Sequence, residues 1–231
     1  LTEHSGGPVF LKLENHQQTG SFKLRGATNA ILTIAPNERQ NGVVTASTGN
    51  HGRALAHAAS IQGLTTTICL SSLVPHNKIE AIRDLGADIR IIGKSQDDAM
   101  EEVSRLVLEE GMKAVPPFDD PRVIAGQGTI GLEIIDDLSD VDTVLIPLSG
   151  GGLAAGIAAA MKAKRPRTRI IGISMKRGAA MNASLNAGKP INAEELDTLA
   201  DSLSGGTAIN YRCTPALRQS LLDDLMLLVA E

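Results

Sequence analysis

Short apolar runs alternate with amphipathic stretches along most of this 231-residue chain. The apolar runs are enriched in β-branched residues, as buried parallel strands are, and lie at 9–14, 43–46, 66–70, 89–93, 142–147, 169–174 and 225–230. Between them the pattern predicts helices at about 21–34, 50–62, 77–85, 95–110, 122–137 and 153–164. A repeating strand–helix order predicts an α/β fold in which helices cover both faces of a parallel sheet.

One segment interrupts this alternation. The stretch "VPPFDDP" (115–121) is rich in Pro and Asp and lies between two strand–helix blocks. A chain of this length can form one large domain or two small ones. We therefore interpret 115–121 as a crossing between two domains.

Composition excludes several classes of function. Aromatic residues are only 2% of the chain and its formal charge is −4, which argues against a nucleic-acid partner. No apolar run approaches the roughly 20 residues that span a bilayer, and the first residues lack the pattern of a signal peptide, so no membrane partner is expected. Cys69 and Cys213 form no C-x-x-C pair, which favours free thiols and a cytoplasmic location.

A glycine-rich loop, "PLSGGGLAAG" (147–156), follows the apolar run at 142–147. Its amides at a helix N-terminus are suited to binding an anion. The run from Gly150 to Ala155 fits a relaxed dinucleotide pattern, but the acidic residue expected about 20 positions later is missing. We therefore expect a single phosphate here, with a tight turn that binds nothing as the alternative.

A second polar loop, "ASTGNHGRALAHAA" (46–59), follows the run at 43–46. Ser47, Thr48 and Asn50 lie at a strand-to-helix junction, where hydroxyls and amides can bind a carboxylate. The alternative is ordinary helix capping by Ser47 or Thr48. Taken alone, His51 is more typical of a first-turn helix residue than of a catalyst.

The stretch "QQTGSFKLRGATNA" (17–30) places Lys23 near the start of a predicted helix, with Thr19 or Ser21 as the expected cap. A helix N-terminus disfavours a protonated ammonium and lowers its pKa, which is what an imine-forming amine requires. The alternative is an ordinary surface lysine. Together, an imine-forming lysine, a phosphate loop and a carboxylate loop predict pyridoxal 5'-phosphate acting on an amino acid.

The chain resembles the fold-type II pyridoxal-phosphate enzymes, in the branch of the threonine dehydratases and serine racemases. The resemblance covers nearly the whole chain and is carried by "SFKLRGA" (21–27), "STGNHG" (47–52), "VIAGQGTIGLEI" (123–134) and "SGGGL" (149–153). Within this branch, the stretches 172–188 and 199–206 are most similar to dehydratases of hydroxyectoine utilisation.

The resemblance implies roles for named residues. Lys23 would bind the cofactor covalently and later remove the substrate Cα proton, Phe22 would pack beside the pyridine ring, and Asn50 would hydrogen-bond the ring hydroxyl. The cofactor phosphate would be bound by Ser149, Gly150, Gly151, Gly152 and Leu153. The substrate carboxylate would be held by Ser47, Thr48, Gly49 and His51, with Gln127 close by.

The resemblance also implies an architecture. We expect two open parallel-sheet domains of the tryptophan synthase β-like kind, truncated at both ends in this chain. The small domain, 33–120, is inserted into a large cofactor-phosphate domain formed by 1–32 and 121–231. The full-length form is expected to be a homodimer. No metal is expected, because Ser174 and Ala180 stand near the places where many relatives carry acidic ligands.

The activity implied is β-elimination of a hydroxy amino acid such as L-threonine or L-serine to a 2-oxo acid and ammonia. Thr48 stands where racemases tend to carry serine, and its extra methyl group restricts χ1, so elimination is expected to dominate. The alternatives are a serine or hydroxyaspartate racemase, and a catalytically silent domain that binds an amino acid or nucleotide.

Overall fold

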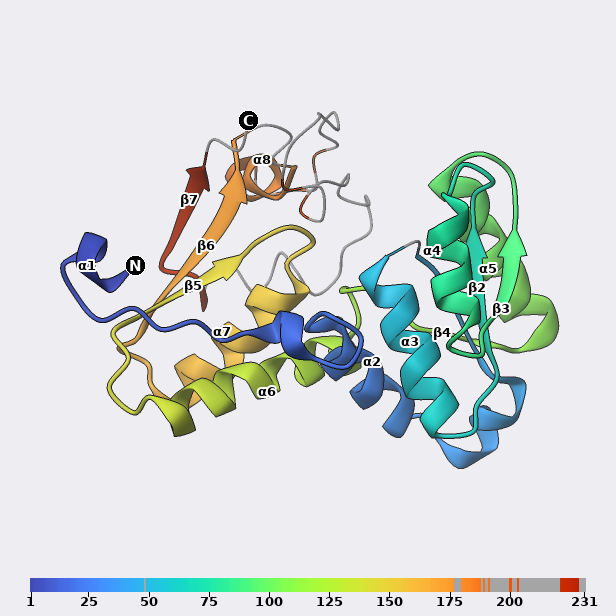
Figure 1. Cartoon of the computed structure of the whole chain (residues 1–231), viewed down its shortest axis with the longest axis horizontal. Helices are drawn as coiled ribbons and strands as arrows, with labels where there is room; N and C mark the ends of the chain where they lie inside the picture. Colours follow the sequence, from blue (N-terminus) through green and yellow to red (C-terminus); the bar gives the residue numbers. More distant parts are fainter. Residues whose placement is uncertain are drawn as a thin grey trace.

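The structure, a computed structural model, describes residues 1–47, 49–176, 180–187, 189, 191, 200, 203 and 221–228. These residues form two separate parallel sheets (Figure 1). The first sheet has the order β3-β2-β1-β4 and comprises β1 (Val43–Ala46), β2 (Thr66–Leu70), β3 (Asp88–Ile91) and β4 (Lys113–Ala114). The second has the order β5-β6-β7 and comprises β5 (Thr143–Pro147), β6 (Arg169–Met175) and β7 (Asp224–Leu228).

Helices cover both faces of the four-stranded sheet. Because side chains alternate along a strand, Val43 and Val44 point to opposite faces. Val43 packs in a core cluster with α3 (Asn50–Ile61) and α4 (His76–Arg83), whereas Val44 packs against α5 (Gln96–Glu110). The predicted α/β layering is therefore confirmed for this sheet.

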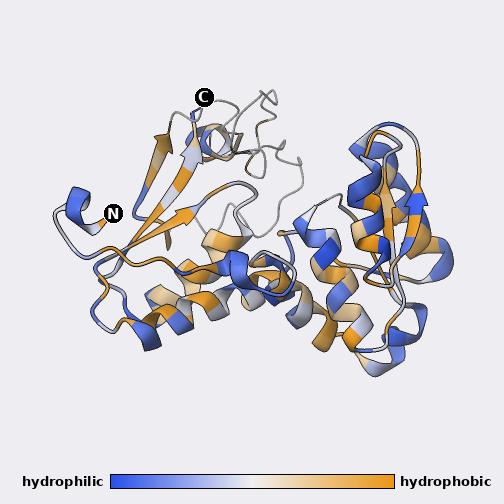
Figure 2. Ribbon diagram, in the orientation of Figure 1, coloured by the Kyte–Doolittle hydropathy of each residue, from blue (hydrophilic) through white to orange (hydrophobic). Residues whose placement is uncertain are grey.

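The three-stranded sheet shares one core cluster with α6 (Pro121–Asp137), α7 (Gly152–Lys164) and α8 (Ala180–Ala187). Ile146 of β5 and Ile170 of β6 are buried in this cluster. Leu145, which directly precedes Ile146 on β5 and therefore points to the opposite face, is 60% exposed. Figure 2 shows β5 as apolar along its length, so part of its apolar surface is open to water within the described residues.

Helix α2 (Lys23–Leu32) connects the two halves of the fold and lies between α3 and α6 (Figure 1). Ala27, Ala30 and Ile31 place its buried face in the core of the four-stranded sheet. Its other contact depends on two glycines. A Cβ on Gly126 of α6 would lie 2.5 Å from the Arg25 carbonyl oxygen, and one on Gly26 would lie 2.8 Å from the Val123 carbonyl oxygen. The backbones of α2 and α6 can touch only because these side chains are absent.

The prediction of a strand at 9–14 is wrong. This segment runs without strand pairing between α1 (Thr2–Ser5) and a 3-10 helix at Glu14–His16. Its charged residues bond to helices instead, because Lys12 pairs with Glu133 (2.8 Å) and Glu14 pairs with Arg25 (2.8 Å). The apolar residues that suggested a strand, Val9, Phe10, Leu11 and Leu13, are exposed.

The other predicted elements form within a few residues of their expected bounds, as the ranges above show. Five short elements were not predicted from the sequence, namely α1, β4, α8 and the 3-10 helices at Glu14–His16 and Pro36–Asn41. None of the helices within the described ranges is long and apolar enough to cross a membrane.

Candidate active site

Lys23 is the first residue of α2, and its amine is surrounded by protein. Nζ donates a hydrogen bond to the carbonyl oxygen of Pro117 at 2.6 Å. It lies 5.4 Å from the ring centroid of Phe22 and 5.8 Å from that of Phe118. Burial, which penalises the charged ammonium, lowers the pKa of Lys23 from 10.5 to about 8. A substantial share of this amine is therefore neutral in mildly alkaline solution.

Thr19 and Ser21 do not cap α2, contrary to the prediction. Phe22 occupies the N-cap position, and α2 has no side-chain cap. The backbone instead starts the helix with a tight turn, in which the Leu24 and Arg25 amides donate to the carbonyls of Ser21 (3.4 Å) and Phe22 (3.1 Å). The Thr19 and Ser21 hydroxyls are buried and have no hydrogen-bond partner among the described residues. They remain available to a bound molecule.

The glycine-rich loop lies against Phe118. Gly151 is the N-cap of α7 with φ +86°, a conformation that favours glycine. A Cβ on Gly150 would lie 2.8 Å from the Phe118 ring, and one on Gly152 would lie 2.7 Å from the Phe118 carbonyl oxygen. Phe118 therefore contacts the glycine loop and also faces the Lys23 amine. The structure brings together the predicted imine-forming amine and the predicted phosphate loop.

The second polar loop precedes α3, whose N-cap is Gly49. The Ser47 hydroxyl oxygen accepts a hydrogen bond from the Gly52 amide in the first turn of α3 at 3.2 Å, although Ser47 is not the N-cap residue. Its hydroxyl hydrogen can still be donated to a ligand. Asn50 is exposed at the start of the helix, and Thr48 lies outside the described residues.

His51 is buried, and its ring has a defined protonation state. Burial and the charge of Lys23 lower the pKa of His51 to about 3, so the imidazole is neutral at ordinary pH. Nε2 lies 2.8 Å from the Val115 carbonyl oxygen and therefore carries the ring proton. Nδ1 is left as an acceptor, with no partner in the described part of the chain. The ring cannot donate to a carboxylate, but the backbone N–H of His51, in the first turn of α3, can.

Gln127 lies at the contact between α2 and α6. Its side chain is 1% exposed and packs against Gly26, one helical turn after Lys23. Neither atom of its amide group has a hydrogen-bond partner among the described residues. A buried amide without partners is costly in free energy, which favours a polar ligand or water beside it.

Pro117 and Phe118 were missed as site residues by the sequence analysis, which interpreted their segment only as a crossing. Pro117 contributes a backbone carbonyl, which leaves no mark in the residue type. Phe118 contributes shape, because two glycines are needed to admit it. The signal available in the sequence was a single aromatic residue in the Pro- and Asp-rich segment 115–121.

Comparison with known proteins identifies the family. The sequence model of the family described as "Pyridoxal-phosphate dependent enzyme" matches residues 1–229. The chain belongs to this family. A Sinorhizobium fredii protein that carries a threonine dehydratase name is 60% identical over 227 residues, which are 98% of this chain and 68% of that protein.

Solved structures of fold-type II members have the same fold. The processed form of threonine deaminase isoform 2 from Solanum lycopersicum is 39% identical with a TM-score of 0.93. Maize serine racemase is 33% identical with a TM-score of 0.88. The match to the tomato enzyme includes 99% of this chain and 62% of the solved chain. The match to the maize enzyme includes 94% of this chain and 65% of the solved chain.

The residues present fit the cofactor of the family. Lys23 supplies a partly neutral amine, and the loop from Ser149 to Leu153 supplies amides at the N-terminus of α7. The buried hydroxyls of Thr19 and Ser21 have no hydrogen-bond partner among the described residues and could bond to polar atoms of the cofactor. Phe22 lies beside the Lys23 amine and packs against the core of the three-stranded sheet. In the described ranges, no group of three or more His, Cys, Asp or Glu side chains is arranged to hold a metal ion.

Proposed function

We propose that this protein is a pyridoxal-phosphate-dependent ammonia-lyase. It would eliminate water from a hydroxy amino acid such as L-threonine or L-serine and yield a 2-oxo acid and ammonia. The observation that carries the proposal is Phe118, which contacts the glycine loop and faces the Lys23 amine. The names of the threonine dehydratase and threonine deaminase relatives support the same reaction class.

Each part of the site would have one task. Lys23 binds the cofactor covalently, and residues 149–153 bind its phosphate at the positive end of α7. Phe22 packs beside the ring and Asn50 bonds its hydroxyl. When bound, the cofactor supplies an electron sink for negative charge at the substrate Cα.

The chain's own groups would hold the substrate and move its proton. Ser47, Thr48, Gly49, the backbone of His51 and Gln127 hold the carboxylate. The Lys23 amine, whose pKa is lowered to about 8 by burial, accepts the Cα proton in its neutral form. The β-hydroxyl leaves as water, and a second water is consumed when ammonia is released, so the overall reaction consumes no net water.

Racemisation is the second candidate function, supported by the likeness to maize serine racemase. It requires a proton donor on the side of Cα opposite Lys23, for which Thr48 is the proposed residue. Chiral chromatography after incubation with L-serine separates the two. D-serine accumulating faster than pyruvate would favour the racemase.

We also propose that residues 33–120 form a small domain inserted into a large domain of 1–32 and 121–231. The four-stranded sheet lies wholly within the first range and the three-stranded sheet within the second, which supports this division. A homodimeric assembly and a cytoplasmic location complete the proposal.

Reductive labelling tests the proposed function. The protein is incubated with pyridoxal phosphate, reduced with borohydride and mapped by peptide mass spectrometry, and 2-oxo acid formation from L-threonine and L-serine is assayed in parallel. We expect the label on Lys23, and Lys23→Ala should abolish both label and activity. Lys94→Ala, at an exposed lysine, is the matched control and should change neither. A label on another lysine, or none, contradicts the assignment.

A further inference from the structure

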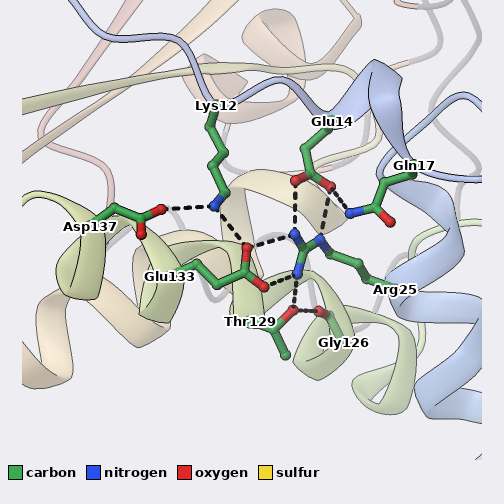
Figure 3. A network of polar contacts seen from close by, with 8 residues as sticks. All are labelled: Lys12, Glu14, Gln17, Arg25, Gly126, Thr129, Glu133 and Asp137. Carbon is green, nitrogen blue, oxygen red and sulfur yellow. Dashed lines mark hydrogen bonds and ion pairs between the residues drawn. The ribbon is translucent and has the colours of Figure 1, made fainter.

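Arg25 is bound by two carboxylates from separate parts of the chain (Figure 3). Its guanidinium donates to Glu14 at 2.8 and 2.9 Å and to Glu133 at 2.5 and 2.7 Å. It also donates to the Thr129 hydroxyl at 3.0 Å, and that hydroxyl donates to the Gly126 carbonyl at 2.8 Å. Both carboxylates are held in the two-pronged geometry that makes Arg–carboxylate pairs strong and directional.

This arginine stands where a cation is ordinarily unfavourable. It is the third residue of α2, at the helix end where the dipole repels positive charge, and α2 has neither a side-chain cap nor an acidic residue in its first turn. The compensating carboxylates come from the 3-10 helix at Glu14–His16 and from α6. The Arg25 and Glu14 side chains are only 14% and 17% exposed. Hydrogen bonding to Arg25 is the main cause that lowers the pKa of Glu133 to about 2.

Both the backbone and the side-chain amine of Lys23 are positioned relative to α6. The first turn of α2 touches α6 directly, because the Arg25 carbonyl lies where a Cβ on Gly126 would be. The Lys23 amine bonds to Pro117, four residues before α6 begins. A rotation of the first turn of α2 on α6 would therefore move the amine away from its acceptor.

We propose that Arg25, held by Glu14 and Glu133, is a positioning residue that fixes the first turn of α2 on α6 and so sets the direction of the Lys23 amine. The catalytic consequence rests on the proposed function, but the positioning itself does not. No other side chain caps this end of α2 among the described residues. Arg25, Glu14 and Glu133 therefore take the place of a cap, and they also fix the orientation of the first turn of α2 on α6.

Competitive labelling of the cofactor-free protein with acetic anhydride tests this proposal, because each lysine is then read by mass spectrometry. In the parent, the labelling of Lys23 should rise through about pH 8. In Arg25→Gln, the amine should swing toward water, and its midpoint should rise by about one pH unit or more. That rise lowers its labelling at pH 7 about tenfold, since each pKa unit changes the neutral fraction tenfold. Arg25→Lys keeps the positive charge but cannot bond to a carboxylate through two parallel N–H groups. It should therefore raise the midpoint of Lys23 labelling nearly as much as Arg25→Gln does.

Arg105→Gln is the matched control. Arg105 also binds several carboxylates, from Glu102, Glu109 and Glu110, but on α5, on the opposite face of the four-stranded sheet from α2. It should leave Lys23 labelling unchanged whatever it does to the thermal midpoint. Lys12→Gln removes the outer bonds to Glu133 and Asp137 and leaves the Arg25 bonds intact, so it should also leave Lys23 unchanged.

Unchanged Lys23 labelling in Arg25→Gln, measured well below its thermal midpoint, would overturn the proposal and leave Arg25 with a purely structural role. If Arg25→Gln does not fold, Glu133→Gln decides, since it retains the Arg25–Glu14 pair. That variant should raise the Lys23 midpoint in the same direction, and an unchanged midpoint would overturn the proposal equally. Acetic anhydride needs no cofactor, so a failure of pyridoxal phosphate to label Lys23 would count against the proposed function alone.

Discussion

The pKa of the Lys23 amine depends on its burial. Desolvation is the one cause that lowers its pKa to about 8, and no positively charged neighbour contributes. His51 is also an ionisable residue, and its ring bonds to Val115, two residues before the Pro117 carbonyl that accepts from Lys23. Its imidazole is neutral. The basicity of the amine is therefore set by how well water is excluded around it. Variants that admit water should raise the pKa even if they leave every charge in place.

Replacing Lys23 by Met should change the pH dependence of stability. The folded-state pKa of about 8 lies below the ordinary 10.5, so the unfolded chain binds more protons between these values. Stability of the parent therefore rises with pH across this window, whereas below it the cost of burying the charged ammonium is constant and Lys23 adds no dependence on pH. The stability of Lys23→Met relative to the parent should fall by roughly 1–3 kcal/mol between pH 8 and 10.5.

Urea unfolding at pH 7, 8, 9 and 10 measures this difference. Lys94→Met, at an exposed lysine, controls for the loss of one positive charge. A difference between Lys23→Met and the parent that stays constant over the whole series would show that the Lys23 amine is not desolvated in the folded protein.

Residue types indicated Lys23 and the glycine loop as candidates, because an amine and bare amides have recognisable chemistry, and both contact Phe118 in the structure. The same reasoning failed for Thr19 and Ser21, since a hydroxyl before a helix suggests a cap whether or not the backbone lets it reach. It also could not assign the tautomer of His51, which depends on a carbonyl 64 residues away in sequence. The roles of Thr48, Asn50 and Gln127 toward a ligand stay predictions.

At the scale of elements, the contact between α2 and α6 depends on Gly26 and Gly126. Alanine favours a helix interior over glycine by about 1 kcal/mol, so propensity alone predicts that Gly126→Ala stabilises the protein. Its Cβ would instead lie 2.5 Å from the Arg25 carbonyl and 2.7 Å from the Gly26 Cα, and backbone atoms cannot yield as side chains do. We expect a net destabilisation of about 1–3 kcal/mol, measured by urea unfolding.

Ala125→Gly, at the exposed neighbouring position in α6, is the control for helix propensity and should lower stability by about 1 kcal/mol. One variant replaces Gly by Ala and the other replaces Ala by Gly, so helix propensity alone predicts opposite effects on stability. Both variants should be less stable than the parent only if packing dominates at position 126. A more stable Gly126→Ala would show that α2 and α6 can separate at little cost.

Patterns of apolar residues predicted the strands and helices well, with one instructive failure. The segment 9–14 is an apolar run like those of the strands, but a strand also needs a neighbour with unpaired backbone groups. Lys12 attaches this segment to Glu133 of α6, which is more than a hundred residues away in the sequence. Glu14 attaches it to Arg25 of α2, which is 11 residues away. Which partner a segment finds is a property of the folded chain, so local periodicity could not show it.

At the scale of the whole molecule, the described residues form two parallel sheets joined through α2 and the segment 115–120. The repeating strand–helix order predicted the fold class, and the resemblance to fold-type II enzymes predicted the pair of sheets. Neither could specify the helix contacts, which depend on the close approaches at Gly26 and Gly126. The finer placement among hydroxyectoine-utilisation dehydratases stays a prediction.

Association of this 231-residue chain should depend on β5. This strand is at the edge of its sheet within the described residues, and Leu145 on it is 60% exposed. Exposed apolar edge strands promote pairing between molecules, and a charged side chain suppresses it. Leu145→Lys should therefore reduce concentration-dependent association, measured by sedimentation velocity. Leu108→Lys, at an 84% exposed position on α5, adds the same charge and should have a smaller effect. Equal effects would indicate that net charge, not the edge, governs association.

Lys23 and His51 both direct their hydrogen bonds to main-chain carbonyls, those of Pro117 and Val115, in the single segment between β4 and α6. No exchange of one residue for another can delete a carbonyl oxygen. The resting acceptors of the amine and the imidazole are thus protected against point mutation at positions 115 and 117, provided that the path of the backbone is kept. An insertion or deletion of one residue there would displace both acceptors together, so lineages that carry this arrangement should vary in residue type at positions 115 and 117 while the segment keeps its length.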